Sequence, residues 1–222
     1  MTRWTPERRA VMDALADEIL HNYGHGRVMV AIDGVDGSGT TAFAADLVER
    51  LERRGHAAFQ ARIDDFHAPA EKRYARGETS GAGRYEDSYD YSAFRRVLVE
   101  PFRLAGSTGF VTAFWDWRRD QPIEPTWLTA PADAILVVNG VFLQRPELRG
   151  LFSYRVWLDV PFDDAWQRLV QADPAAHDDT ARARSEAGMK LYLKAVKAAE
   201  LATAVYDNRD PDHPRRIFSD SC

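Results

Sequence analysis

The chain has 222 residues, of which 45% are hydrophobic and 28% charged, an ordinary globular composition with enough apolar residues for a sizeable core. Its 29 basic and 34 acidic residues give a net charge of −5, which argues against a general nucleic-acid-binding or anionic-membrane surface. The single cysteine, Cys222, has no partner in the chain, so a disulfide framework is excluded and a reducing compartment is expected.

The N-terminal residues and the distribution of apolar segments predict a soluble, cytoplasmic protein. Charged residues such as Arg8, Asp13 and Glu18 interrupt the apolar positions up to Tyr23, which the apolar middle of a signal peptide would not tolerate. Because no run of about 18 apolar residues occurs, we also expect no membrane span.

Alternating helical and strand-like patterns run along the chain. An amphipathic helix is expected within residues 1–24, ended by Gly24 and Gly26. Short apolar runs typical of buried parallel strands lie at 28–32, 57–63, 110–115, 134–138, 155–160 and 216–218. Helical patterns lie at 41–54, 92–104, 162–172 and 186–206. The alternation predicts an α/β fold in one domain over residues 1–222, a three-layer sandwich with a parallel sheet and right-handed crossovers.

Two stretches break the alternation and read as mobile excursions. Residues 67–91 are rich in Gly, Arg, Tyr and Asp, and residues 173–187 begin with a polar stretch. In α/β sheets, excursions at the carboxyl ends of strands often build the ligand site or a lid over it. Solvated surface loops without a role are the simpler alternative.

A glycine-rich segment follows the first expected strand directly. Residues 34–41, GVDGSGTT, match the phosphate-binding loop G-x-x-x-x-G-K-[ST] at every fixed position but one. The glycines let backbone N–H groups turn inward around an anion, and the following helix adds the positive end of its dipole. Thr41 stands where a hydroxyl would coordinate Mg²⁺. Thr40 stands where the lysine would reach the β- and γ-phosphates, so this Walker A loop is degenerate.

Further motifs, taken in order with this loop, resemble the bacterial uridine kinase-like members of the uridine kinase/phosphoribulokinase family. They are Ile32-Asp33-Gly34, Asp64-Asp65-Phe66-His67, YEDSYDY at 85–91, Asn139-Gly140-Val141-Phe142-Leu143, Arg145-Pro146-Glu147-Leu148 and Asp207-Asn208. The match begins near residue 27 and continues to the end of the chain. The resemblance implies a nucleoside-monophosphate-kinase-like P-loop fold, ATP with Mg²⁺, and transfer of the γ-phosphoryl group to a hydroxyl of a nucleoside or sugar-like acceptor.

The resemblance also assigns roles to particular side chains. Asp64 follows the second strand where the family places the carboxylate that accepts the acceptor's hydroxyl proton, so it is the candidate general base. A capping role for Asp64 or Asp65 is the alternative. The nucleotide-binding candidates are Gly34, Asp36, Gly37, Ser38, Gly39, Thr40, Thr41, Arg168, Arg182, Arg184 and Asn208. The acceptor-binding candidates are His67, Tyr89, Trp115, Asp116 and Arg118, although Trp115 could equally belong to the core.

Three departures from the family pattern remove charge from the expected pocket. Thr40 replaces the loop lysine, Asn139 stands where the family usually has an acid, and Ala172 stands where many members have an arginine. A lost charge-assisted hydrogen bond is worth about 1.5–3 kcal/mol, and more where charge builds in a transition state. Thr41 and Asn139 remain the candidate metal contacts, but Asn139 brings no negative charge to hold Mg²⁺.

Basic residues elsewhere could compensate for the missing lysine. Arginines suit a lid over phosphates because their planar fork is permanently charged, and the candidates are Arg168, Arg182 and Arg184. Three lysines follow at helical spacing, at Lys190, Lys194 and Lys197. A solvated helix face is the simpler interpretation for these lysines.

Two functions from different classes therefore compete. The first is an ATP-dependent small-molecule kinase in which lid arginines replace the lysine. The second is a catalytically impaired or repurposed P-loop protein that binds a nucleotide or phosphorylated metabolite without phosphoryl transfer. A third interpretation, an isolated change at Thr40 in a working enzyme, explains neither Asn139 nor Ala172. No nucleic-acid or membrane partner is expected, and a homodimer is left open, with Trp4 and Trp127 either at an interface or in the core.

Overall fold

The computed structural model describes residues 7–104 and 106–218, so Trp4 and Cys222 lie outside the described residues. The described part of the chain contains a central sheet of six strands in the order β2-β5-β1-β6-β7-β8. The strands are β1 (Val28–Gly34), β2 (Ala58–Arg62), β5 (Ile135–Gly140), β6 (Tyr154–Asp159), β7 (Ala204–Asp207) and β8 (Arg215–Ile217). All neighbours pair in parallel except β7 and β8. The α/β fold with a mostly parallel sheet is confirmed.

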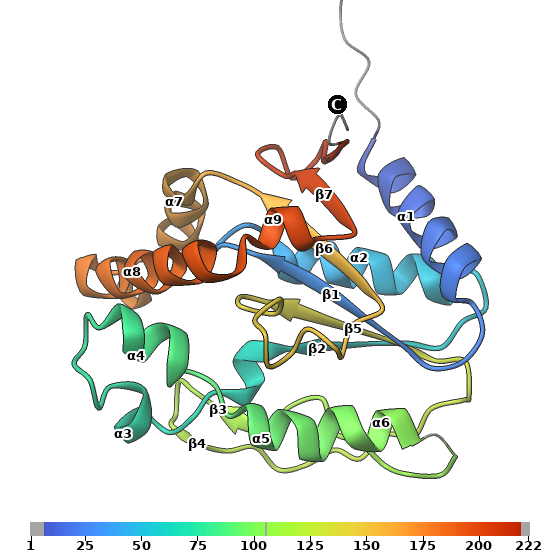
Figure 1. Ribbon diagram of the computed structural model, residues 1–222, viewed down its shortest axis with the longest axis horizontal. Helices are drawn as coiled ribbons and strands as arrows, with labels where there is room; N and C mark the ends of the chain where they lie inside the picture. Colours follow the sequence, from blue (N-terminus) through green and yellow to red (C-terminus); the bar gives the residue numbers. More distant parts are fainter. Residues whose placement is uncertain (1–6, 105, 219–222) are drawn as a thin grey trace, which may run out of the picture.

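Helices cover both faces of this sheet (Figure 1). One face carries α1 (Arg8–Tyr23) and α2 (Thr40–Glu52), whose buried Leu15 and Phe43 belong to the same core as Val30. The other core, which includes Leu136, contains buried side chains from five further helices. These helices are α5 (Tyr91–Phe94) and α6 (Glu100–Leu104), joined by a π turn, α7 (Phe162–Ala172), α8 (Asp179–Val196) and α9 (Ala198–Leu201).

The central strands are buried on both faces, which explains their apolar sequences. Every residue of β1 and β5 is buried, as expected for continuous apolar runs between two helical layers. The predicted strands at 28–32, 57–63, 134–138 and 155–160 all correspond to strands of this sheet within one or two residues. The predicted helices at 41–54, 92–104 and 162–172 are also present.

The predicted strand at 110–115 is wrong. Phe110 forms an isolated antiparallel bridge with Leu128, and the short strand β3 (Trp115–Asp116) pairs with β4 (Gln121–Pro122) in a separate ribbon. Phe110 is nevertheless fully buried, because its ring packs edge-on against Phe59 and Phe102. Burial under a helix produced the apolar run here, and periodicity does not distinguish this from burial within a sheet.

The predicted helix at 186–206 is also wrong at both ends. The helix α8 starts seven residues earlier, at Asp179, where the side chain of Asp178 accepts a hydrogen bond from the Ala181 N–H as an N-cap. It ends at Val196, and the next residue, Lys197, has a left-handed backbone with φ 51°. The residues that follow form α9 and the strand β7, so the last part of the predicted helix is a strand of the central sheet.

Both predicted excursions contain regular structure. Residues 67–91 hold α3 (Ala70–Arg73) and α4 (Gly81–Glu86), and α4 packs along α8. A Cβ added to Gly81 would lie 2.7 Å from the Ala187 Cβ, so glycine at this position lets the two helices approach closely. Residues 173–187 consist of one 3₁₀ turn (Pro174–Ala176) and the first part of α8. Figure 1 shows α4 and α8 together at one end of the sheet.

Within residues 7–104 and 106–218, the structure has no helix that combines the length and apolarity needed to cross a bilayer. Trp127, left open between core and interface, is 63% exposed and therefore lies outside the core.

One buried carboxylate ties α8 to the end of β1. Asp33 is fully buried and accepts hydrogen bonds from the Tyr192 hydroxyl and from the backbone N–H groups of Gly34 and Gln144. Burial raises the pKa of Asp33 to about 7, although these hydrogen bonds favour the ionised form. Its ionisation is therefore linked to folding near neutral pH.

Replacing Tyr192 with Phe should destabilise the protein more at pH 8.5 than at pH 5.5. Loss of the hydroxyl raises the folded-state pKa of Asp33 further above its unfolded value. The pH-dependent part of the loss relative to the wild type therefore appears only as pH rises past the wild-type folded pKa of about 7. We expect a loss of about 1 kcal/mol at pH 5.5 and about 1.5–3 kcal/mol at pH 8.5 in urea unfolding. Tyr206→Phe is the control, because this buried ring packs on Phe43 in the other core. Equal losses at both pH values for Tyr192→Phe would contradict the linkage.

Candidate functional site

The site forms at the carboxyl edge of the central parallel strands. The pairing register sets Ile32 of β1 beside Asn139 of β5, and Asn139 beside Arg62 of β2. The segment between β1 and α2 begins at Gly34, and α2 begins at Thr40. Because all these strands end at one edge, the loop, Asn139 and the residues after β2 are brought together, as the sequence predicted.

Two glycines of the loop have backbone conformations that favour glycine. Gly37 and Gly39 have φ values of 81° and 92°, in the left-handed region. Gly37 also lies against α7, since an added Cβ would be 2.1 Å from the Ala165 carbonyl oxygen. The loop backbone is thus fixed both by its own turns and by the helix behind it.

Asn208 holds the loop from the opposite side. Its Nδ2 donates a 2.7 Å hydrogen bond to the Ser38 carbonyl oxygen, and Asn208 is 1% exposed. Its own backbone N–H donates to the Asp159 carbonyl oxygen at the end of β6. Asn208 therefore ties the phosphate loop to the end of β6.

A chain of hydrogen bonds leads from the loop to the predicted general base. The Arg84 guanidinium donates through Nη2 to both carboxylate oxygens of Asp36, at 3.0 and 3.3 Å. Its Nη1 donates to the Tyr89 hydroxyl at 3.2 Å, and that hydroxyl donates to Asp64 Oδ1 at 3.0 Å. The Ser185 hydroxyl donates to the same Asp36 carboxylate. We call Asp36, Arg84, Tyr89 and Asp64 the loop-to-base chain.

Arg84 is the member of this chain that the sequence reasoning missed. Burial opposes its charge, but Asp36, Tyr89 and Asp64 outweigh that effect and raise the pKa of Arg84 above its ordinary value. The sequence offered a weak signal, an arginine inside an excursion rich in tyrosine and acids. Because Asp36 is 48 positions away, local patterns could not reveal the pair.

Asp64 occupies a turn that leaves its carboxylate available. It lies in the 3₁₀ turn Ile63–Phe66, where no side chain caps the N-terminus, so the capping alternative finds no support here. Oδ2 faces Arg62 Nη2 at 3.5 Å, and the side chain is 33% exposed. A proton acceptor needs this access to its substrate.

His67 and Tyr89, both predicted acceptor contacts, lie together beside Asp64. Their ring centroids are 4.5 Å apart, and the Trp117 ring lies 5.7 Å from His67. Nδ1 of His67 donates to the Asp64 carbonyl oxygen at 2.7 Å. Burial lowers the pKa of His67 to about 4, although Asp64 favours the charged form, so the imidazole is neutral at pH 7.

The predicted metal contacts Thr41 and Asn139 also lie together. Asn139 Nδ2 donates to Thr41 Oγ1 at 3.1 Å, and Gln60 Nε2 donates to Asn139 Oδ1 at 2.8 Å. Protein-bound Mg²⁺ usually has one or two carboxylate ligands, whereas this group is neutral. Among the described residues, no cluster of three metal-ligating side chains occurs. These residues do not fit a resident Mg²⁺ held by the protein.

The three predicted arginines have different surroundings. Arg168 donates to the carbonyl oxygens of Asn208 and Arg209, at the rim of the loop. Arg182 pairs with Asp163 across α8 and α7. Arg184 is buried and donates to the backbone carbonyl oxygens of Arg73, Gly77 and Ser80, so its contacts hold the segment before α4.

The remaining predicted acceptor contacts lie on the β3–β4 ribbon. The Asp116 carboxylate accepts hydrogen bonds from the backbone N–H groups of Arg118 and Arg119, which closes the turn. Trp115 Nε1 donates to Asp120. Arg118 reaches Asp173 at 3.6 Å, so this ribbon contacts the expected lid.

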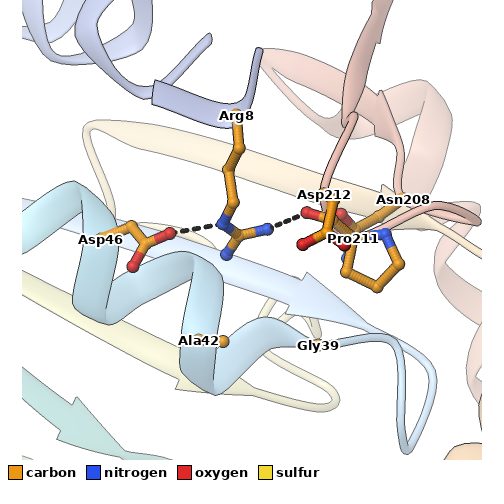
Figure 2. A pocket seen from close by; sticks show the side chains of 7 residues that line it. All are labelled: Arg8, Gly39, Ala42, Asp46, Asn208, Pro211 and Asp212. Atoms are coloured by element: carbon orange, nitrogen blue, oxygen red, sulfur yellow. Dashed lines mark hydrogen bonds and ion pairs between the residues drawn. The ribbon is translucent and has the colours of Figure 1, made fainter. Parts of the chain in front are cut away.

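A pocket of about 250 Å³ opens beside the loop (Figure 2). Its walls come from the start of α2, from the residues after β7 and from α1: Arg8, Gly39, Ala42, Asp46, Asn208, Pro211 and Asp212. Arg8 crosses it, donating to the Asp46 carboxylate and the Pro211 carbonyl oxygen. The pocket is smaller than the roughly 300–1,000 Å³ of sites that enclose a whole ligand. It has room for only part of a nucleotide.

The fold and the phosphate loop together define the class of protein. A mostly parallel sheet with a glycine-rich phosphate loop between its first strand and the next helix is the fold of the P-loop kinases. The solved structure of a possible uridine kinase from Bacillus stearothermophilus has this fold, with a TM-score of 0.72 and 26% identity, over 90% of this chain and 98% of that one.

Two curated relatives with similar sequences are uridine kinases. A uridine kinase from Lactobacillus johnsonii is 28% identical over 174 residues, 77% of each chain. A uridine kinase from Leuconostoc citreum is 22% identical over 170 residues, covering 77% of this chain and 78% of the relative. No protein-family model matches. The resemblance to bacterial uridine kinase-like P-loop proteins, predicted from the motifs, is confirmed, and in this chain the Walker A lysine is replaced by Thr40.

Gly37→Ala should destabilise the protein more than Gly55→Ala. Both glycines have φ near 80°, so both variants carry the penalty of about 1–2 kcal/mol for a left-handed alanine. At Gly55 the new Cβ meets no atom within 4 Å, whereas at Gly37 it meets Ala165. We expect a further loss of about 1–3 kcal/mol for Gly37→Ala in chemical denaturation. Equal losses would mean that α7 does not support the loop.

Proposed function

We propose that the chain is an ATP-dependent small-molecule kinase that transfers a phosphoryl group to a hydroxyl of a nucleoside or sugar-like acceptor. The observation that carries the proposal is the loop-to-base chain, because it joins the phosphate loop to an accessible carboxylate through two intervening side chains. Phosphoryl transfer needs these two elements side by side, a cradle for the donor phosphates and a group that orients the attacking hydroxyl.

The donor side is formed by the loop and the pocket beside it. The backbone N–H groups between Gly34 and Thr41 would surround the phosphates, with Asn208 holding the loop in shape. The pocket in Figure 2 adjoins Gly39 and would take the base of the nucleotide. Magnesium would arrive bound to the nucleotide, since Thr41 and Asn139 offer only neutral oxygen atoms.

The acceptor side is formed by residues 67–91 and the β3–β4 ribbon. Asp64 would take the proton of the acceptor hydroxyl, and Tyr89 would orient its carboxylate. His67, neutral at pH 7, would contact the acceptor through Nε2. Asp116 and Arg118 would lie at the edge of this side, with residues 173–187 as the lid. In this proposal, residues 1–222 act as one kinase-like domain.

One observation favours a second function, binding without transfer. The contact between Asn139 and Thr41 leaves a neutral group where a kinase usually holds its metal, and Thr40 brings no charge to the phosphates. A protein of this kind would bind a nucleotide or a phosphorylated metabolite at the same loop. Its affinity would not depend on Asp64.

Calorimetric titration with ATP, with and without Mg²⁺, tests the donor site first. We expect micromolar binding that Mg²⁺ strengthens. A phosphate-transfer assay with uridine, other nucleosides and simple sugars follows, and product formation is expected with at least one acceptor. Binding without any product would favour the second function. No ATP binding at all would overturn the kinase proposal.

Asp64→Asn should lower kcat by about 10²–10⁴-fold while ATP affinity stays unchanged, because the amide cannot accept the hydroxyl proton. Asp65→Asn is the matched control, since this neighbouring carboxylate lies in the same turn. We expect Asp65→Asn to retain most of the activity. If the two variants lose activity equally, Asp64 is not the general base.

A further inference from the structure

A phosphate loop without its lysine needs a positive charge from elsewhere. Thr40 supplies none, and each of the three arginines expected to compensate has hydrogen-bond partners outside residues 34–41. Arg182 pairs with Asp163, Arg184 with the backbone before α4, and Arg168 with the backbone after β7. Lys190 pairs with Glu186 on α8, and Lys197 pairs with Glu200 on α9.

Unlike these residues, Arg84 contacts a side chain of the phosphate loop. It contacts Asp36, whose side chain projects from the third position of the loop, and Tyr89, which binds Asp64. The transferred phosphoryl group must lie between the loop and the acceptor hydroxyl, and that is the span Arg84 bridges. A guanidinium has five N–H groups, and the hydrogen bonds within the described residues engage Nη1 and Nη2 only. Donors therefore remain for phosphate oxygens.

The surrounding structure fixes Arg84 in this place. Its guanidinium lies over the rings of Phe142 and Tyr89, with centroids 5.4 and 5.6 Å away. Phe142 has a left-handed backbone, with φ 62°, which is costly for a bulky residue and is often found at functional sites. Gly188 of α8 makes room for the arginine stem, because a Cβ there would lie 2.5 Å from Arg84 Cγ. The side chain is 12% exposed, so its charge is poorly screened by water.

We propose that Arg84 is the cation that binds the terminal phosphates of the donor, in place of the missing loop lysine. The inference rests on the proposed function and names the residue that completes its donor site. Without ligand, Asp36 holds the guanidinium. When the phosphates enter, they take over part of its hydrogen bonding, while Asp36 keeps it oriented. The arginine fork suits this exchange, because it can bind two anionic groups at once.

A simpler role for Arg84 must be separated from this one. A carboxylate at Asp36 would repel phosphate if it were unpaired, so Arg84 could help binding only by neutralising Asp36. The double variant Asp36→Asn/Arg84→Met distinguishes the two roles. It removes both charges, so no buried carboxylate is left unpaired and the fold is retained.

The experiment measures affinities for ATP, AMP and inorganic tripolyphosphate by calorimetry, in the same magnesium buffer. The single variants are Arg84→Met and Asp36→Asn, and Arg76→Met is the matched control. Arg76 is an exposed arginine of the same segment that pairs with Glu86 and Asp87. Thermal unfolding shows that each variant is folded.

The double variant should bind ATP about 10- to 100-fold more weakly than Asp36→Asn alone, with AMP affinity changed less than threefold. Adding Thr40→Lys should restore most of the lost affinity. Arg76→Met should behave as the wild type. If the double variant binds ATP as well as Asp36→Asn does, Arg84 only neutralises Asp36 and the proposal is overturned. An equal loss for ATP and AMP would also overturn it, since it would indicate general damage to the site.

The results also distinguish failure of the kinase proposal from failure of the Arg84 proposal. If the wild type binds tripolyphosphate but not ATP, the kinase proposal fails, and the same variants still test Arg84 against tripolyphosphate. An Arg84-dependent loss would then uphold the assignment. If the wild type binds neither probe, both proposals fail.

Discussion

A carboxylate inside a phosphate-binding loop is the constraint on which the rest of this site depends. Asp36 would repel the ligand that the loop exists to bind, so its charge has to be met within the chain, and Arg84 meets it. That pairing requires α4 to lie against α8, which in turn requires glycine at 81 and 188. It also brings Tyr89 into reach of Asp64. The helices of the excursion, the loop and the carboxylate after β2 are therefore parts of one electrostatic arrangement.

The charge changes at Thr40 and Asn139 offset each other. A loop lysine and an acid after β5 have opposite charges, and this chain lacks both. Neutral hydrogen bonds run here from Gln60 through Asn139 to Thr41 and join these polar groups without an ion. A buried amide network is stable only when its members are paired in this way, since a lone buried polar group would be costly. The charged pair nearest the loop is instead Asp36 with Arg84.

The sequence predicted those features that depend on near neighbours in the chain. The loop, the strand before it and the helix after it follow from local pattern and glycine chemistry, and Asn208 and Asp64 follow from the family motifs. It mistook 110–115 for a sheet strand because Phe110 is buried by rings from other elements. It missed Arg84 and Gln60 for the same reason, since their importance comes from partners 48 and 79 positions away. The end of α8 depends on the left-handed backbone of one residue, Lys197, which hydrophobic periodicity does not predict.

The close approach of Gly37 to Ala165 has a mechanical consequence. Because Gly37 has no side chain, the loop backbone packs directly against α7, and a displacement of the helix would displace the loop as well. The helix ends at Ala172, and Asp173 has an extended backbone. Any hinge for residues 173–187 therefore lies beyond Ala172, in the short link before α8. Movement of residues 173–187 would also reach the loop, because Ser185 in this segment donates a hydrogen bond to the Asp36 carboxylate.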